Sequence, residues 1–186
     1  MSVGILVAGV GNLFLGDDGF GPEVVRRLAA GPVPSGVRVV DYGIRGMHLA
    51  YDLLDGYDAI VLVDAMPSAG IRAEPPVRAG ELRVLEIGAD STGALGEGGF
   101  DAHGMDPVAV LASLGALGGD LPPRTLVVGA QPADVTEGIG LSPPLRDAVD
   151  GAVAVVRELV EELLRPGAET ATTVDTANTA DTCRAS

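Results

Sequence analysis

A chain of 186 residues is about the size of one domain, and with 47% hydrophobic residues it can bury a full core. The formal net charge of -14 argues against nucleic acids and anionic membrane surfaces as partners, because proteins bind both largely through basic side chains. All 12 basic residues are arginines, so Schiff-base chemistry and a P-loop lysine are excluded.

Short apolar runs alternate with helical patterns, which is typical of strand-helix units that build a largely parallel sheet. Gly4 to Val10 predicts the first strand, and Pro22 to Ala30 predicts a helix that starts with its proline. Val37 to Asp41 predicts a second strand, Met47 to Leu54 a second helix, and Ala59 to Asp64 a third strand. The continuous apolar run in the third strand indicates a central position with both faces covered.

The second half of the chain continues this alternation. Glu81 to Ile87 predicts a weaker strand at an edge of the sheet, in a direction that the pattern leaves open. A helix is predicted from Asp106 to about Leu117, and a buried strand from Thr125 to Gly129. The last helix is predicted to start near Ser142-Pro143 and to end by Arg165.

The elements together predict a single-domain three-layer α/β sandwich, with a mostly parallel twisted sheet of about five strands and helices on both faces. The domain spans residues 1–165, and the polar composition of 166–186 predicts a disordered tail. Cys183, the single cysteine, lies in that tail, which excludes an intrachain disulfide and a multi-thiolate zinc site. No apolar run approaches the roughly 20 residues that cross a bilayer, and Met1-Ser2-Val3 lacks a basic signal segment. We therefore expect a cytoplasmic protein. We also expect a monomer, because the sequence shows no exposed apolar stripe beyond the needs of the core.

The segment from Gly9 to Glu23 leads from a strand into a helix through a glycine loop that carries two carboxylates, Asp17 and Asp18. A phosphate site would need backbone N–H groups and usually a cationic side chain, but the nearest basic residue, Arg26, lies inside the following helix. Two carboxylates would also repel a phosphate. The loop therefore favours a cation.

Polar side chains stand at the predicted carboxyl ends of several strands, where open parallel sheets bind their ligands. The first strand leads to Asp18, the second ends at Asp41, the third ends at Asp64, and the late strand leads to Gln131. If the strand order is 2-1-3, a crevice opens between strands one and three. Asp18 and Asp64 then face each other, with Asp41 to one side.

Facing carboxylates repel each other unless one is protonated or a cation bridges them. His103 lies in a glycine-rich loop before a predicted helix, from which its imidazole could reach the same edge. Two carboxylates and one histidine suit nickel, zinc, iron or manganese better than calcium, because no all-oxygen cage is evident.

Simpler roles remain open for each of these side chains. Asp17 or Asp18 could cap the following helix or close a turn, and Asp64 could cap a turn. His103 could be a solvated loop residue, and His48, within a predicted helix, a surface or packing residue. Dinucleotide binding is also conceivable, but the third glycine of that motif is replaced by Phe14.

Four segments in the same order resemble the hydrogenase maturation peptidases. They are Gly9 to Gly21, Val61-Leu62-Val63-Asp64-Ala65, Asp101-Ala102-His103-Gly104, and Gly129-Ala130-Gln131-Pro132. The resemblance implies an endopeptidase that trims the C-terminal extension of a nickel-iron hydrogenase large-subunit precursor after nickel insertion. It also implies that Asp18, Asp64 and His103 are the metal ligands and catalytic residues.

The metal implied by the resemblance is nickel carried by the precursor, for which zinc or another divalent metal could substitute. Asp41 is a candidate auxiliary base. Ile44 departs from the family pattern, which usually has threonine there, so the fit to substrate is expected to differ. A non-catalytic metal-binding or precursor-binding accessory protein on the same scaffold is the alternative.

Overall fold

The computed structural model describes residues 4–66, 77–87, 111 and 114–165. In these ranges five strands form one sheet with the order β2-β1-β3-β5-β4. The strands are β1 (Ile5–Val10), β2 (Val37–Gly43), β3 (Ala59–Ala65), β4 (Leu82–Glu86) and β5 (Arg124–Ala130). The helices with described bounds are the 3-10 helix η1 (Gly16–Gly19), α1 (Phe20–Ala29), α2 (Gly46–Leu53) and α4 (Pro143–Leu163).

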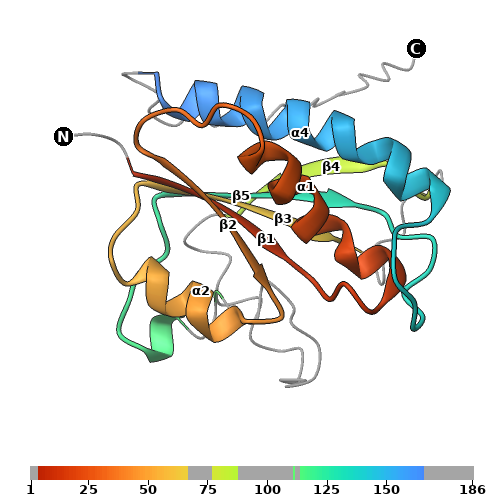
Figure 1. Cartoon of the computed structure of the whole chain (residues 1–186). Helices are drawn as coiled ribbons and strands as arrows, with labels where there is room; N and C mark the ends of the chain where they lie inside the picture. Colours follow the sequence, from red (N-terminus) through yellow and green to blue (C-terminus); the bar gives the residue numbers. More distant parts are fainter. Residues whose placement is uncertain (1–3, 67–76, 88–110, 112–113, 166–186) are drawn as a thin grey trace, which may run out of the picture.

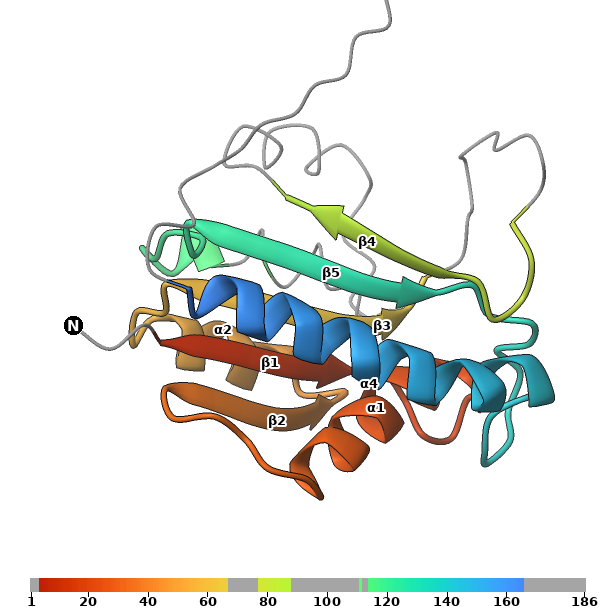
Figure 2. The same cartoon turned by 90° about the horizontal axis from the view of Figure 1, so that it is seen from above.

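The sheet lies between two helical layers, which confirms the predicted α/β class. Helices α1 and α4 cover one face and α2 covers the other (Figure 1), and the view from above shows α1 and α4 side by side over the sheet (Figure 2). Successive residues of β1 point to opposite faces, as strand geometry requires. Ile5 and Val7 pack with α1 and α4, whereas Leu6 and Ala8 pack with α2.

The predicted 2-1-3 order is confirmed, because β1 pairs in parallel with β2 on one side and β3 on the other. β3 also pairs in parallel with β5, and every residue of β3 is buried. β4 is the edge strand and runs antiparallel to β5. Its direction could not be predicted because a short strand has the same pattern of side chains in either direction.

Helix α1 begins earlier than predicted. The turn η1 continues directly into it, so α1 starts at Phe20 rather than Pro22. Pro22 still lies in the first turn, where the missing N–H has no partner to lose. The predicted start of the helix at Asp106 and the tail 166–186 lie outside the described residues, although Leu111 is helical. Within the described ranges, none of the helices combines the length and hydrophobicity needed to span a membrane.

Candidate functional site at the carboxyl ends of β1 and β3

Glycines bring the start of α1 into direct contact with the strand ends. A Cβ on Gly21 would lie 2.2 Å from the carbonyl oxygen of Val63 and 2.3 Å from that of Val10. A Cβ on Gly9 would likewise lie 2.6 Å from the carbonyl oxygen of Gly21. Only glycine permits these approaches. The preceding turn η1 therefore contacts β3 and lies over the junction of β1 and β3.

The loop between β1 and η1 folds back on itself and fixes Asp18. Gly11 has a φ of 130°, and a Cβ there would come within 1.9 Å of the Asp18 carbonyl oxygen. The Asn12 N–H donates to Asp18 Oδ2 at 2.6 Å. Within the described ranges Asp18 Oδ1 has no hydrogen-bond partner. Asp18 Oδ2 thus closes the loop, which is one of the structural roles that the sequence left open for this residue. Asp18 Oδ1 is available to a ligand.

Asp64 lies on the neighbouring strand and is only 6% exposed. Its Oδ1 accepts the N–H of Ala65 at 2.8 Å, and it pairs across the sheet with Gly129 of β5. A buried carboxylate is expensive unless it is paired or bound to a cation. Its place at the end of the central strand matches the predicted crevice.

Asp41 flanks this pair on the outer strand β2, opposite Gly9 of β1. It is exposed, and its Oδ1 accepts the N–H of Gly43 at 2.9 Å. The Arg45 guanidinium donates to the backbone carbonyl oxygen of Asp41 at 2.7 Å. Arg45 thus stabilises the end of β2, but this contact does not involve the Asp41 carboxylate.

Asp17 differs sharply from Asp18, and the sequence did not separate the two. Asp17 is 1% exposed and accepts four hydrogen bonds: from the backbone N–H groups of Ala133 (2.8 Å), Asp134 (3.0 Å) and Ser142 (2.7 Å), and from the Ser142 hydroxyl (2.9 Å). Burial alone would raise the pKa of Asp17, but these hydrogen bonds together outweigh it and hold the pKa below its ordinary value. Asp17 therefore anchors the turn to the segment before α4.

The adjacency of the two carboxylates could have shown that their roles differ, but not which of them is structural. Successive side chains on a tight turn point in different directions, so Asp17 and Asp18 cannot both enter the same crevice. One of them therefore had to find partners elsewhere in the protein. Neither caps α1, because the residue before that helix is Gly19 and no side chain bonds to its first turn.

The described residues supply two of the three predicted metal ligands. His103 lies outside them, so its position is untested, while His48 is exposed on α2. Among the residues that the structure describes, no group of three or more His, Cys, Asp or Glu side chains could hold a metal. Of the predicted ligands, Asp18 and Asp64 are thus the two that the structure describes, on the turn after β1 and near the end of β3.

Comparison with known proteins gives a consistent result. The family model for hydrogenase maturation protease matches residues 22–159. The Hydrogenase 2 maturation protease of Escherichia coli K12 is 29% identical over 159 residues, covering 85% of this chain and 91% of that protein. The hydrogenase expression/formation protein HupD of Rhodobacter capsulatus is 30% identical over 158 residues, covering 83% and 70%.

A solved structure agrees with these relatives. The hydrogenase maturating endopeptidase HybD of E. coli superposes with a TM-score of 0.70 at 26% identity, covering 86% of this chain and 93% of that one. The likeness therefore extends over nearly the whole described domain, and the match of the family model covers more than half of the sequence. The chain belongs to the hydrogenase maturation protease family, a family of hydrolases.

Proposed function

We propose that this protein is an endopeptidase that removes the C-terminal extension of a nickel-iron hydrogenase large-subunit precursor once nickel has been inserted. The observation that carries the proposal is the position of Asp18 and Asp64 at the carboxyl ends of two adjacent central strands. Ligands of open parallel sheets bind in that place. The names of the relatives supply the connection to hydrogenase.

Recognition of the precursor is proposed to depend on its nickel. Asp18 offers a carboxylate oxygen that has no partner within the described ranges, and Asp64 offers a carboxylate from the neighbouring strand. His103 would complete the set. Carboxylate and imidazole ligands suit nickel, and zinc or another divalent metal could replace it. A precursor without metal would offer these side chains no cation to bind, so the empty precursor is expected to bind poorly.

Proton transfer is assigned to the exposed carboxylate of Asp41. One of its oxygens holds the Gly43 N–H, and the other can accept a proton from the attacking water and pass it to the departing amine nitrogen. The metal, when bound, can polarise the scissile carbonyl. The protein's own contribution is then to hold the peptide against the strand ends with Asp18 and Asp64 and to remove the proton with Asp41.

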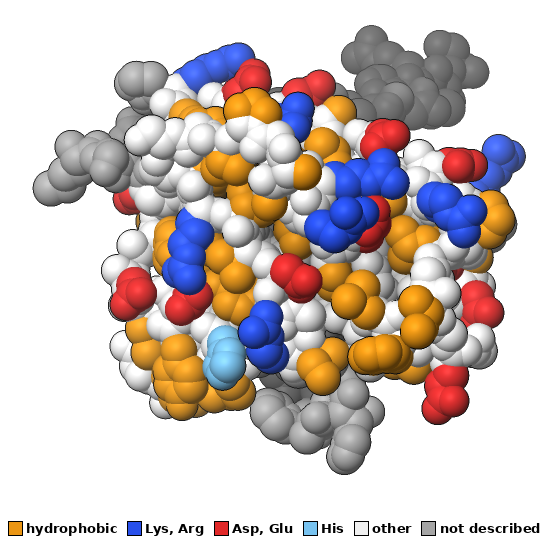
Figure 3. Space-filling model, viewed as in Figure 1, with side chains coloured by type: hydrophobic (Ala, Val, Ile, Leu, Met, Phe, Trp, Pro, Cys, Tyr) orange, Lys and Arg blue, Asp and Glu red, His pale blue; other side chains and the backbone are white. Residues whose placement is uncertain are grey.

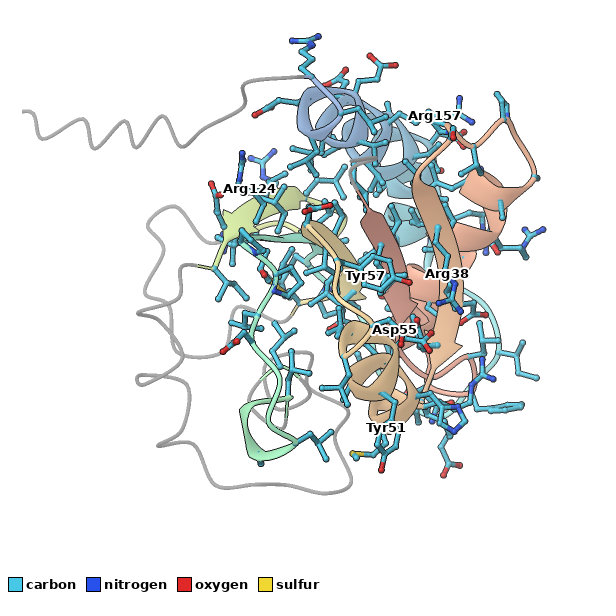
Figure 4. All side chains as sticks on the ribbon, turned by 90° about the vertical axis from the view of Figure 1, so that its left-hand side faces the viewer. Arg38, Tyr51, Asp55, Tyr57, Arg124 and Arg157 are labelled. Atoms are coloured by element: carbon cyan, nitrogen blue, oxygen red, sulfur yellow. The ribbon has the colours of Figure 1, made fainter. Side chains whose placement is uncertain are left out.

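The decisive experiment is cleavage of a large-subunit precursor, loaded with nickel or free of it, followed by intact mass. Wild type is compared with Asp18→Ala, Asp64→Ala and His103→Ala. Asp55→Ala is the control, because Asp55 is an exposed carboxylate in the turn after α2 (Figure 4). We expect a shortened product only with nickel, from wild type and Asp55→Ala. Cleavage of the nickel-free precursor would refute recognition through the metal.

A second candidate is the non-catalytic accessory protein. One relative, the coenzyme F420 hydrogenase subunit delta of Methanothermobacter thermautotrophicus, is 28% identical over 160 residues, and its name describes a hydrogenase subunit rather than a protease. The same assay separates the two candidates. A nickel-dependent complex that forms without cleavage of any cognate precursor would favour the accessory protein.

A further inference from the structure

A pocket of about 360 Å³ lies beside the turn that carries Asp18. One wall is formed by Leu13, Gly16 and Gly19, and the other by the segment that precedes α4 and by its first turns, including Ile139, Leu141 and Arg146. Gly19 immediately follows Asp18. A peptide lying in this pocket would therefore contact the same turn that carries Asp18.

We call the loop that carries Leu13 and Phe14, and the segment that carries Ile139, the two lips of the pocket. Backbone hydrogen bonds join them before any ligand binds. The Gly16 N–H donates to the Gly138 carbonyl at 2.9 Å, and the Gly138 N–H donates to the Phe14 carbonyl at 2.9 Å. The buried carboxylate of Asp17 adds its hydrogen bonds to the same segment. Because these contacts fix the lips, little conformational entropy is lost when a ligand binds.

The lips expose large apolar side chains. Leu13 is 51% exposed, Phe14 68% and Ile139 85%. Figure 3 shows hydrophobic side chains gathered at the lower right of the view, over the loop between β1 and α1. Apolar side chains held exposed on loops that are pinned in place, beside a candidate active site, are typical of surfaces that bind a protein partner.

Among the charged side chains that line the pocket, one arginine has no ion-pair partner within the described part of the chain. Glu23 is bound by Arg26 and Arg27, and these hydrogen bonds, with that of Arg26 the strongest influence, hold the pKa of Glu23 below its ordinary value. Arg27 also contacts Asp150. Arg146 is exposed, donates to the Leu141 carbonyl at 3.0 Å, and forms no ion pair within the described part of the chain. The pocket thus combines apolar lips with a single available guanidinium.

We propose that this pocket binds the precursor beside its scissile bond, with an apolar side chain between Leu13 and Ile139 and an acidic side chain paired with Arg146. This inference rests on the proposed peptidase function and adds the feature of the substrate that the enzyme reads next to the cut. An apolar residue close to an acidic one matches both the lips and the guanidinium.

The test measures kcat and KM for cleavage of the nickel-loaded precursor. The pocket variants are Leu13→Ser, Ile139→Ser and Arg146→Glu. Two controls change an apolar and a basic side chain that do not line this pocket: Val33→Ser, in the loop between α1 and β2, and Arg165→Glu, just after α4 ends. Because all the substituted side chains are exposed, folding should be retained, and circular dichroism checks this.

We expect each pocket variant to raise KM by about tenfold with kcat within about twofold, since binding energy is lost equally from the bound ground state and the transition state. Replacing one acidic side chain of the precursor with lysine should restore the KM of Arg146→Glu. An unchanged KM in the pocket variants, with wild type still cleaving, would overturn the pocket and leave the peptidase standing.

Two further outcomes would overturn the proposal. Rescue of Arg146→Glu only by amidation of the precursor's C-terminal carboxylate would refute the acidic side chain as the partner. If wild type cleaves no nickel-loaded precursor, the proposed function fails, and the pocket's role as a substrate site fails with it.

Discussion

Strand β1 is held at both ends by the same contact, a backbone N–H bonded to an aspartate. Before the strand, Gly4 N donates to Asp58 Oδ2 at 2.7 Å, and after it Asn12 N donates to Asp18 Oδ2 at 2.6 Å. The surroundings differ. Near Asp58 the polar groups are paired with one another, as when Arg38 donates to the Tyr57 hydroxyl at 3.0 Å (Figure 4). Near Asp18, three further carboxylates lie along the sheet edge or in the same turn.

This comparison teaches that a hydrogen bond alone does not distinguish a structural carboxylate from a functional one. The amino end of the sheet uses its polar side chains to join loops. At the carboxyl end Asp17 serves that purpose, and Asp18, Asp41 and Asp64 are the residues that the proposed function assigns to the substrate and its metal. The difference is consistent with the topology, because the carboxyl ends of β1 and β3 lie against the start of α1.

The strongest test of this difference is to neutralise Asp18 and Asp58 in turn without changing the size of either side chain. Asp18→Asn and Asp58→Asn should each lower the free energy of unfolding by only about 1 kcal/mol, because asparagine still accepts the backbone N–H. Asp18→Asn should nevertheless lower kcat/KM for precursor cleavage by at least about 100-fold, since a cation ligand is lost. Urea unfolding and mass-detected cleavage check both. Equal activities for the two variants would contradict the assignment.

Asp17 allows the structural side of the comparison to be measured. Asp17→Ala leaves three backbone N–H groups and a hydroxyl without their acceptor, so the free energy of unfolding should fall by about 3 kcal/mol. Ser142→Ala removes only the hydroxyl donor and should cost about 1 kcal/mol with cleavage retained. Urea titrations of both variants provide the measurement. A loss for Asp17→Ala no greater than for Ser142→Ala would refute the anchor.

The pH dependence of stability follows from the same residue. The pKa of Asp17 in the folded state is below the ordinary value of 3.8, so the unfolded chain binds the proton more readily. The contribution of Asp17 is therefore complete above about pH 4 and is lost as the pH falls through the folded pKa. The difference in unfolding free energy between wild type and Asp17→Asn should shrink below that point. A difference that grows on acidification would show the opposite sign.

The smallest effect is expected at Ile44, which is 59% exposed in the turn after β2. Ile44→Thr should change the free energy of unfolding by less than about 0.5 kcal/mol, as is usual for an exposed position. Because Ile44 follows Asp41 closely, the added hydroxyl should alter KM by a few-fold if this turn contacts substrate. Matched kinetics on one precursor test this, and an unchanged KM would remove Ile44 from the substrate surface.

Much of the fold could be predicted because its signals are local. The apolar run of β3 and the heptad-like spacing of Leu145, Val149 and Val156 in α4 each follow from burial on one strand or helix. The direction of β4 depends on pairing with β5, which lies almost 40 residues away from it in the chain, as the contact between Arg124 and Glu86 shows. No local pattern records such a partner.

The candidate site was predictable to the same extent. Asp41 and Asp64 lie near the carboxyl ends of β2 and β3, and Asp18 lies in the turn after β1, so their shared edge could be derived from strand order. The role of Asp17 could not, because its partners belong to the segment before α4 and nothing in the glycine loop indicates them. The position of His103 stays a prediction.

The anchor at Asp17 has a consequence for biosynthesis. Its bond to Ser142 joins residues 125 positions apart, so the turn that presents Asp18 is secured only after nearly all of the domain has left the ribosome. A nascent chain that ends before α4 lacks the partners of Asp17, so this turn is not anchored even if β1 and β3 have already paired. The proposed site should therefore take its final form only late in synthesis.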